Sequence, residues 1–488
     1  MRSLRPAAML LLLLTGCGGA AESGAKPAGA PPAICSNRST GQPAIAPLLR
    51  AQSEDIILTH ATIWTSTGAP LTDSWIRFSK GRITAIGSGG APKVNTDGGG
   101  GAKIIDATGK WVTAGIIDTH SHLGVYPSPN TSGHDDGNEA TGPTTPEVSS
   151  QDSVWVQDPG FERALRGGVT AMQILPGSAN LVGGRGFVMK NKRGARVAEQ
   201  LRFPGSPETL KMACGENPKR VYGEQGRMPS TRMGNIATIR QMWIDAAEYR
   251  KQWDDYNAKL DGWCAADDQA GSPPDAPSRD LGKETLAEVL RGHILPQIHC
   301  YQADDMLNQI QVADEMGFAI RSFHHAVEAY KIRDVLAAKQ IAISTWPDWW
   351  GFKIEAYDTI NEGPGLLTEA GARAVLKSDS PITNQRLGQE AGKALAAARS
   401  AGIKLDENDA IRWVTANAAW ALGIDQLAGT LEVGKMADIV VWDHQPLSSY
   451  ASAVWVFVDG IAELDPNKPA DPWSDFEAGT NNHVRGGR

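Results

Sequence analysis

Short apolar runs, separated by glycine, proline and aspartate turns, dominate the chain after residue 54. Runs with strand character lie at residues 55–58, 61–64, 74–78, 82–86, 103–106 and 111–112, and similar runs return at 437–442 and 453–458. Runs of β-branched and aromatic residues between turn residues are typical of strands. The pattern therefore predicts a small β-sandwich built from both chain ends, over residues 54–115 and 425–465.

Strand and helix patterns alternate in the middle of the chain. Strands are predicted at 168–175, 295–299, 319–323, 341–344 and 374–377, and helices at 161–166 and 303–316, where apolar residues recur at helical spacing. A longer helix is predicted at 230–260, inside an insertion that covers about residues 217–283. Repeated strand–helix units favour a parallel sheet, open or closed into a barrel, and the fold class is therefore α/β.

The N-terminal residues differ from the rest of the chain. Arg2 and Arg5 precede an apolar run at residues 7–14, and Leu-Thr-Gly-Cys follows, ending at Cys17. The run is too short to span a bilayer and is typical of a cleaved signal peptide, here residues 1–17. The four residues resemble a bacterial lipobox, in which the cysteine is lipidated; an ordinary signal peptide with an incidental cysteine is the alternative.

Residues 18–53 are rich in Gly, Ala, Pro and Ser and predict a flexible linker, and residues 466–488 predict a C-terminal tail. Together with the lipobox, the linker predicts an exported, lipid-anchored protein. Gly18 favours the periplasmic face of the outer membrane over the inner membrane. Four further cysteines allow three full sets of disulfides, and the sequence selects none of them: Cys35, Cys214, Cys264 and Cys300.

Composition narrows the functional classes. Of 488 residues, 41% are hydrophobic and 21% are charged, as in an ordinary folded enzyme, and the formal net charge is −8. Lysine and arginine are scattered, so nothing indicates a nucleic-acid partner. The expected partner is a small-molecule substrate, with the membrane reached through the N-terminal anchor only; a homo-oligomer is left open.

The segment Gly-Ile-Ile-Asp-Thr-His-Ser-His, residues 115–122, carries the most chemistry. Because side chains alternate along a strand, His120 and His122 point to the same side and can hold one metal ion. This segment, with residues 414–423 and 429–442, resembles the amidohydrolase superfamily, and in particular its imidazolonepropionase-like and prolidase-like members. The resemblance covers about residues 55–463. It implies a metal-dependent hydrolase with a (β/α)₈ TIM-like barrel over residues 116–424.

The resemblance places further metal ligands at the ends of later strands. His299 ends the predicted fifth strand, His325 follows the sixth, and Asp379 follows the eighth. His324 is a lower-ranked alternative to His325, because neighbouring residues of a strand point in opposite directions.

Binuclear members of the superfamily also have an anionic bridge between the metals, usually a carboxylated lysine. Lys211 resembles that fourth-strand position, Glu216 is its rival, and Lys190 is a weaker third candidate. The apolar residues that flank Lys211 favour it over Glu216.

The resemblance implies two divalent metal ions, with Zn²⁺ favoured. The implied ligands of one ion are His120, His122 and Asp379, those of the other are His299 and His325, and Lys211 lies between. The ions would lower the pKa of a shared water, and Asp379 would take its proton and pass it to the leaving nitrogen. The predicted reaction is hydrolysis of a C–N bond in an amide, peptide-like or cyclic amide substrate.

Three other functions are alternatives to this one. A deaminase of the same superfamily is disfavoured, because Gln302 stands where those enzymes have a glutamate, three residues after His299. A lactonase or other esterase needs nearly the same site. A catalytically inactive surface binding protein is the alternative from another class.

Substrate contacts are predicted at Asn180, Glu328 and Tyr330. Asn180 belongs to a glycine-rich segment, residues 175–186, which is predicted to follow the third strand and either to bring backbone N–H groups near a ligand or to form a structural turn.

Overall fold

Two eight-stranded sheets organise the described part of the chain. The structure, a computed structural model, describes residues 33–36, 53–90, 101–266, 271–468 and 473. The predicted signal peptide with Cys17, nearly all of the linker and most of the C-terminal tail lie outside these residues. Within them, no helix is both long and apolar enough to cross a bilayer.

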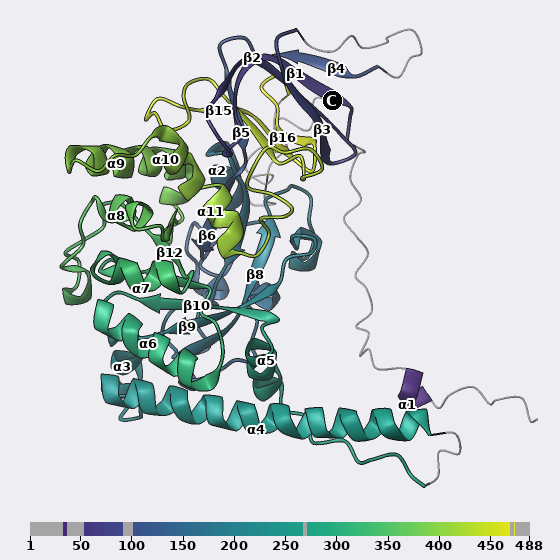
Figure 1. Cartoon of the computed structure of the whole chain (residues 1–488), viewed down its shortest axis with the longest axis vertical. Coiled ribbons are helices and arrows are strands. Elements are labelled where there is room, and N and C mark those ends of the chain that lie inside the picture. Colours follow the sequence, from purple (N-terminus) through teal and green to yellow (C-terminus); the bar gives the residue numbers. More distant parts are fainter. Residues whose placement is uncertain (1–32, 37–52, 91–100, 267–270, 469–472, 474–488) are drawn as a thin grey trace, which may run out of the picture. The chain divides into compact units, whose positions relative to one another are not determined.

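The first sheet combines strands from both chain ends (Figure 1). Its order is β16-β15-β14-β5-β1-β2-β3, with β4 paired to β1. The strands are β1 (Ile56–Trp64), β2 (Leu71–Ser79), β3 (Arg82–Ser88), β4 (Lys103–Asp106), β5 (Trp111–Ala114), β14 (Ile439–Trp442), β15 (Ala453–Val458) and β16 (Ile461–Leu464). The first two predicted strands are one continuous strand, and β16 was not predicted.

This sheet has a hydrophobic core of its own. Phe78 of β2 and Phe457 of β15 are buried, with ring centroids 5.0 Å apart, although β2 and β15 are not neighbours in the sheet. The sheet therefore curls so that its distant strands meet around shared apolar side chains. Its division into the two layers of a sandwich stays a prediction.

The second sheet is a nearly closed barrel, in the order β6-β7-β8-β9-β10-β11-β12-β13. Its last and first strands meet where the backbone N–H of Asp379 donates to the carbonyl of His120 at 2.9 Å. The strands are β6 (Ile116–Ser121), β7 (Val169–Ile174), β8 (Val182–Lys190), β9 (Glu208–Ala213), β10 (Ile294–Cys300), β11 (Ser322–His325), β12 (Ala342–Thr345) and β13 (Arg373–Leu376).

One barrel strand runs against the others. β8 is antiparallel to both β7 and β9, whereas the remaining neighbours are parallel. The prediction of a loop over residues 175–186 after a third strand is therefore wrong: the loop is 175–181, it follows the second barrel strand, and β8 begins at Val182. Glycine is depleted in strands, so the sequence pattern did not indicate where β8 begins. Its glycines allow close packing, because a Cβ at Gly186 would lie 2.4 Å from Oγ1 of Thr209.

Helices connect most of the parallel strands. Figure 1 shows α6 to α10 side by side along the outer side of the barrel. The helices are α2 (Gly160–Arg166), α3 (Glu216–Glu224), α4 (Arg232–Ala265), α5 (Leu281–Leu290), α6 (Ala303–Met316), α7 (Arg333–Ala338), α8 (Gly363–Glu369), α9 (Leu387–Ser400), α10 (Glu407–Trp413) and α11 (Ala416–Ala421). α6 has the predicted bounds, and Gly317 ends it in the left-handed conformation that glycine adopts without strain.

The chain forms two compact units, one of residues 1–42 with 255–275 and one of the remaining residues. In the smaller unit a disulfide joins Cys35 of α1 (Ala33–Ser36) to Cys264 near the end of α4. In the larger unit, which holds both sheets, a second disulfide joins Cys214 to Cys300, just beyond the end of β9 and at the end of β10. The sequence did not select these pairs.

Candidate metal centre

Three of the predicted ligands converge at one end of the barrel, where β6 and β13 meet. Nε2 of His120 lies 3.2 Å from Nε2 of His122 and 3.3 Å from Oδ1 of Asp379, and the last two atoms are 3.2 Å apart. Tetrahedral ligands at about 2.0–2.1 Å from a zinc ion lie about 3.3 Å from one another. The three donor atoms therefore have the spacing of one face of a zinc tetrahedron.

Burial favours the neutral form of four barrel histidines, which is the form that binds metal. It lowers the pKa of His120, His299, His324 and His325 well below the usual value for histidine. Neutral imidazole is the form with a free nitrogen lone pair, which a metal ion requires. Nδ1 of His122 lies 2.8 Å from the carbonyl of Leu175, so it donates there and leaves Nε2 without a proton.

Asp118, the aspartate of the Asp-x-His-x-His segment, joins the two strands that carry these ligands. It is buried and accepts hydrogen bonds from the backbone N–H of His120 and of Ser378, both at 3.1 Å, and from the hydroxyl of Ser378. Burial raises its pKa to about 6. Asp118 therefore fixes the position of the His120 backbone relative to that of Ser378, the residue before Asp379.

Backbone strain is concentrated at the same place. His325, Ala326 and Asp379 have φ values of 67°, 42° and 60°, a region that non-glycine residues rarely adopt. Each such residue costs about 1–3 kcal/mol, and strain of this kind clusters at functional sites. At His325 the strain also breaks the alternation of the strand, so that His324 and His325 both contact the ring of His120. The prediction that His324 points away is therefore wrong.

His325 and Asp379 share a lysine that the sequence analysis missed. Nζ of Lys377 lies 2.9 Å from Nδ1 of His325 and 3.3 Å from Oδ2 of Asp379. Burial lowers the pKa of Lys377 to about 7. Although burial also raises the pKa of Asp379, Lys377 and His122 outweigh this and hold it below the usual value. Lys377 precedes Asp379 by two residues, so the strand period itself could have indicated it.

Lys211 and His299 come from the neighbouring barrel strands β9 and β10. Both are buried, and Nζ of Lys211 donates to the carbonyl of Pro176 at 2.9 Å. Burial lowers the pKa of Lys211 to about 8. Nδ1 of His299 is buried with no hydrogen-bond partner among the described residues. The ring of His299 lies 4.3 Å from that of His325, the other predicted ligand of the second ion.

An aromatic wall lines the centre beyond His325. Tyr301 stacks on the ring of His325 at 4.9 Å, and Trp346 contacts its edge at 4.7 Å. Phe352, which is 58% exposed, continues the wall at 6.2 Å from Tyr301. Tyr301 follows His299 by two residues, so here too the strand period was an available signal.

Two bridging candidates have other partners. Lys190 is buried between Asp438, at 2.9 Å, and Asp459, so it joins the barrel to the first sheet and its candidacy as a bridging ligand is wrong. Glu216 forms an ion pair with Lys353 at 3.4 Å.

The three predicted substrate contacts hold loops together. The amide of Asn180 donates to Glu139 and Thr145 and accepts from Tyr222. Glu328 accepts from the backbone N–H of residue 303, at the start of α6, and Tyr330 donates to the carbonyl of residue 358. These contacts give all three a structural role in the described chain.

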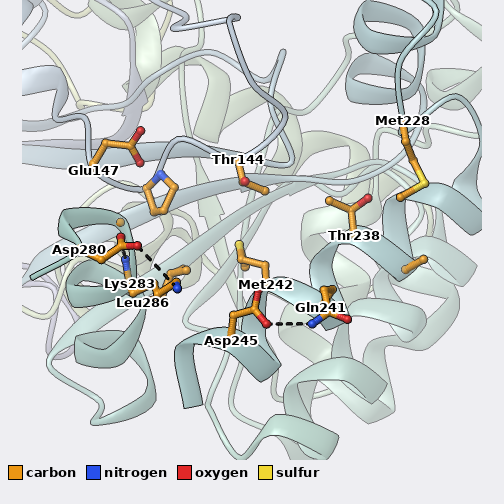
Figure 2. Close-up of a pocket in the computed structure, with 13 residues that line it drawn as sticks. Thr144, Glu147, Met228, Thr238, Gln241, Met242, Asp245, Asp280, Lys283 and Leu286 are labelled. Atoms are coloured by element: carbon orange, nitrogen blue, oxygen red, sulfur yellow. Dashed lines mark hydrogen bonds and ion pairs between the residues drawn. The ribbon is translucent and has the colours of Figure 1, made fainter. Parts of the chain in front are cut away.

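Two cavities can be compared with the candidate metal centre through the residues that line them. An open cavity of about 610 Å³ is lined mainly by residues of α4, α5 and the loop at residues 144–147 (Figure 2), and none of the predicted ligands lines it. A smaller cavity of about 230 Å³ is lined by Val125, Pro176 and Asp136 among others. None of the predicted ligands lines this smaller cavity either, but its lining residue Pro176 accepts a hydrogen bond from Lys211 through its carbonyl.

Comparisons with known proteins show which family the chain resembles. A model of the amidohydrolase family matches residues 358–467. The chain is 34% identical over 438 residues to amidohydrolase tasK of Hapsidospora irregularis, a match that covers 84% of this chain. The chain spans only 43% of the length of that relative. It is 24% identical over 364 residues to the imidazolonepropionase of Caulobacter vibrioides, which covers 70% of this chain and 81% of that protein.

A solved structure extends the match to a complete protein. The amidohydrolase from Thermotoga maritima MSB8 is 34% identical, with a TM-score of 0.74, and the match covers 84% of this chain and 100% of that one. Amidohydrolases typically bind divalent metal ions, and His120, His325 and Asp379 also form a group in which one donor atom from each lies within 4.8 Å of the others. The chain belongs to the amidohydrolase family and is a hydrolase that acts on carbon–nitrogen bonds.

Proposed function

We propose that this chain hydrolyses an amide, peptide-like or cyclic amide bond with the help of a divalent metal, with Zn²⁺ favoured, held by His120, His122 and Asp379. The observation that carries this proposal is the triangle of donor atoms with sides of 3.2–3.3 Å. A metal bound there would supply a Lewis acid that lowers the pKa of water. The imidazolonepropionase relative supports the cyclic-amide branch of this proposal.

Asp379 is the proposed general base and acid. Its Oδ1 faces His120 and His122, whereas its Oδ2 faces Lys377. The lysine holds the carboxylate in one orientation and keeps it ionised, so it can take a proton from the attacking water and deliver it to the leaving nitrogen.

A second ion is proposed beside the first. Its proposed ligands are His325 and His299, whose Nδ1 has no hydrogen-bond partner in the described part of the chain, with Lys211, carboxylated on Nζ, as the proposed bridge. Nδ1 of His325 lies 2.9 Å from Nζ of Lys377, and Nε2 of that ring is free to bind an ion when Nδ1 is the hydrogen-bond donor in this contact. Of the rivals for the bridge, Glu216 is engaged by Lys353, which supports Lys211.

The residues around the proposed metal site indicate the kind of substrate and disfavour one alternative reaction. The wall of Tyr301, Trp346 and Phe352 favours a small-molecule substrate with an apolar group next to the scissile bond. Gln302, the position at which a deaminase needs an acid, accepts a hydrogen bond from Arg232, so it is neither acidic nor free. A lactonase or esterase activity needs the same donors, and ester substrates belong in the test.

Metal removal tests the proposal. Zinc is quantified in purified protein, and hydrolysis of N-acyl amino acids, dipeptides, cyclic amides and matched esters is measured before and after chelation. We expect stoichiometric zinc, and loss of amide hydrolysis on chelation that added Zn²⁺ restores, because the barrel's own residues do not activate water without a Lewis acid. Unchanged hydrolysis by metal-free protein would contradict metal activation, and protein without zinc or activity would indicate the inactive binding protein.

We also propose that the protein is exported and anchored by lipid on Cys17, with the outer membrane favoured. The two disulfides support this, because disulfides persist mainly outside the reducing cytosol. We expect Cys17→Ser to move the protein from the detergent-rich phase to the aqueous phase in detergent partitioning and to abolish labelling with a fatty acid. Cys17→Ser protein that still incorporates the fatty acid would rule out this cysteine as the attachment site.

A further inference from the structure

A line of buried polar groups extends behind the proposed metal ligand His120. Nε2 of His120 faces the metal position, whereas its Nδ1 lies 2.8 Å from Nδ1 of His324. Nε2 of His324 lies 2.7 Å from Oε1 of Gln297, whose own Nε2 donates to the carbonyl of Ala421 at 3.1 Å. The side chains of His120, His324 and Gln297 are completely buried, so water does not compete for these hydrogen bonds.

The protons in this line have one arrangement. A carbonyl only accepts, so the amide nitrogen of Gln297 donates to Ala421 and its oxygen is left for His324. That oxygen also only accepts, so His324 has its proton on Nε2 and a lone pair on Nδ1. The lone pair accepts a hydrogen bond from Nδ1 of His120, and Nε2 of His120 is then free of protons and can bind a metal.

We infer that Gln297 and His324 are positioning residues that fix the tautomer and ring orientation of His120 and thereby raise the affinity of the centre for its metal. This inference rests on the proposed metal site and adds to it the residues that determine how tightly the ion is held. Fixing the second nitrogen of a ligand histidine typically changes metal affinity or activity about 10–100-fold.

His324 has a different proposed role from His325. His324 was an alternative metal ligand in the sequence, but both of its nitrogens are engaged, one by His120 and one by Gln297. A ligand would need one of them free. The structure therefore assigns His324 to the support of a ligand.

The test measures metal affinity rather than turnover. The Kd for Zn²⁺ of the whole protein is determined by competition with a chromophoric chelator for Gln297→Leu, Gln297→Glu and His324→Leu. We expect Gln297→Leu and His324→Leu to raise the Kd about 10–100-fold, because each removes an acceptor from the line. Gln297→Glu keeps an acceptor for Nε2 of His324, so its Kd should stay near that of the wild type.

Gln173→Leu is the matched control. Gln173 is another fully buried barrel glutamine, and its amide donates to Oγ1 of Thr209 at 2.9 Å, outside the line of Gln297, His324 and His120. We expect it to lose unfolding free energy, as Gln297→Leu does, while its Kd for Zn²⁺ stays unchanged. A Kd raised equally in both variants would show that loss of barrel stability, and not the hydrogen-bond line, controls metal affinity.

Two further measurements separate the outcomes. The visible spectrum of the Co²⁺-loaded protein should be the same for His324→Leu and wild type at saturation, because no ligand is lost; a changed spectrum would make His324 a ligand and overturn the inference. In the double variant Gln297→Leu/His324→Leu, the effects on Kd should not add, since both break one line. Wild-type protein that binds no metal would refute the proposed function as well, whereas tight binding unaffected by Gln297→Leu would refute the inference alone.

Discussion

Asp379→Asn should reduce kcat by about 10²–10⁴-fold, the contribution of a well-placed general acid–base. The asparagine keeps an oxygen toward His120 and His122, so the metal should still bind at saturating Zn²⁺. It carries no charge, however, and can neither accept the proton of the attacking water nor pair with Lys377, which lies 3.3 Å from Oδ2. The measurement is kcat on the best substrate, with the zinc content of each sample determined.

Asp358→Asn serves as the control for this variant. Asp358 is an exposed carboxylate that pairs with Lys331 at 2.7 Å, and its neutralisation should leave kcat unchanged. If fully zinc-loaded Asp379→Asn turned over substrate as fast as Asp358→Asn, Asp379 would not be the proton carrier.

Lys190→Met should lower the free energy of unfolding by about 3–5 kcal/mol, the usual cost of leaving one half of a buried ion pair without its partner. Lys190 at the end of β8 is fully buried, and it neutralises Asp438, whose side chain is 4% exposed, as well as Asp459. Both aspartates belong to the end of the chain that completes the first sheet. Urea denaturation followed by circular dichroism measures the loss.

Two further variants serve as controls for Lys190→Met. Lys339→Met removes a lysine that also contacts both oxygens of an aspartate, Asp314, but on the surface, so it should cost less than about 1 kcal/mol. Lys190→Met/Asp438→Asn should recover part of the lost stability, because the buried charge is removed with its partner. Equal stability of the Lys190→Met and Lys339→Met proteins would mean that the buried pair does not join the two sheets energetically.

Strand ends could be predicted from the sequence better than the directions of individual side chains. His120 and His122 lie together because the period of a strand is two, and the same rule applied to Asp379 and His299 would have found Lys377 and Tyr301. The rule failed at His324, since positive φ values at His325 and Ala326 break the alternation. Tertiary packing imposes backbone strain of this kind, so the local sequence pattern does not predict it.

Features that depend on distant packing were not predictable. The start of β8 was taken for a loop because glycine is depleted in strands, and here residues 183, 184 and 186 are glycines. Tertiary contacts show why two of them are needed: a Cβ at Gly186 would meet Oγ1 of Thr209, and one at Gly184 would meet Val148. Lys190 ends an apolar strand, as a barrel ligand would, but its partner Asp438 lies about 250 residues away along the chain. The disulfide pairs likewise join cysteines whose spacing carries no information about pairing.

The short connection between β7 and β8 has a consequence for how this enzyme can evolve. It orients His122 through the carbonyl of Leu175 and Lys211 through the carbonyl of Pro176, at 2.8 and 2.9 Å. Every amino acid brings such a carbonyl, so exchanges of side chain along the connection leave both hydrogen bonds in place, whereas an inserted or deleted residue would displace them. Natural variation at Leu175 and Pro176 should therefore change the side chain more readily than the length of the connection.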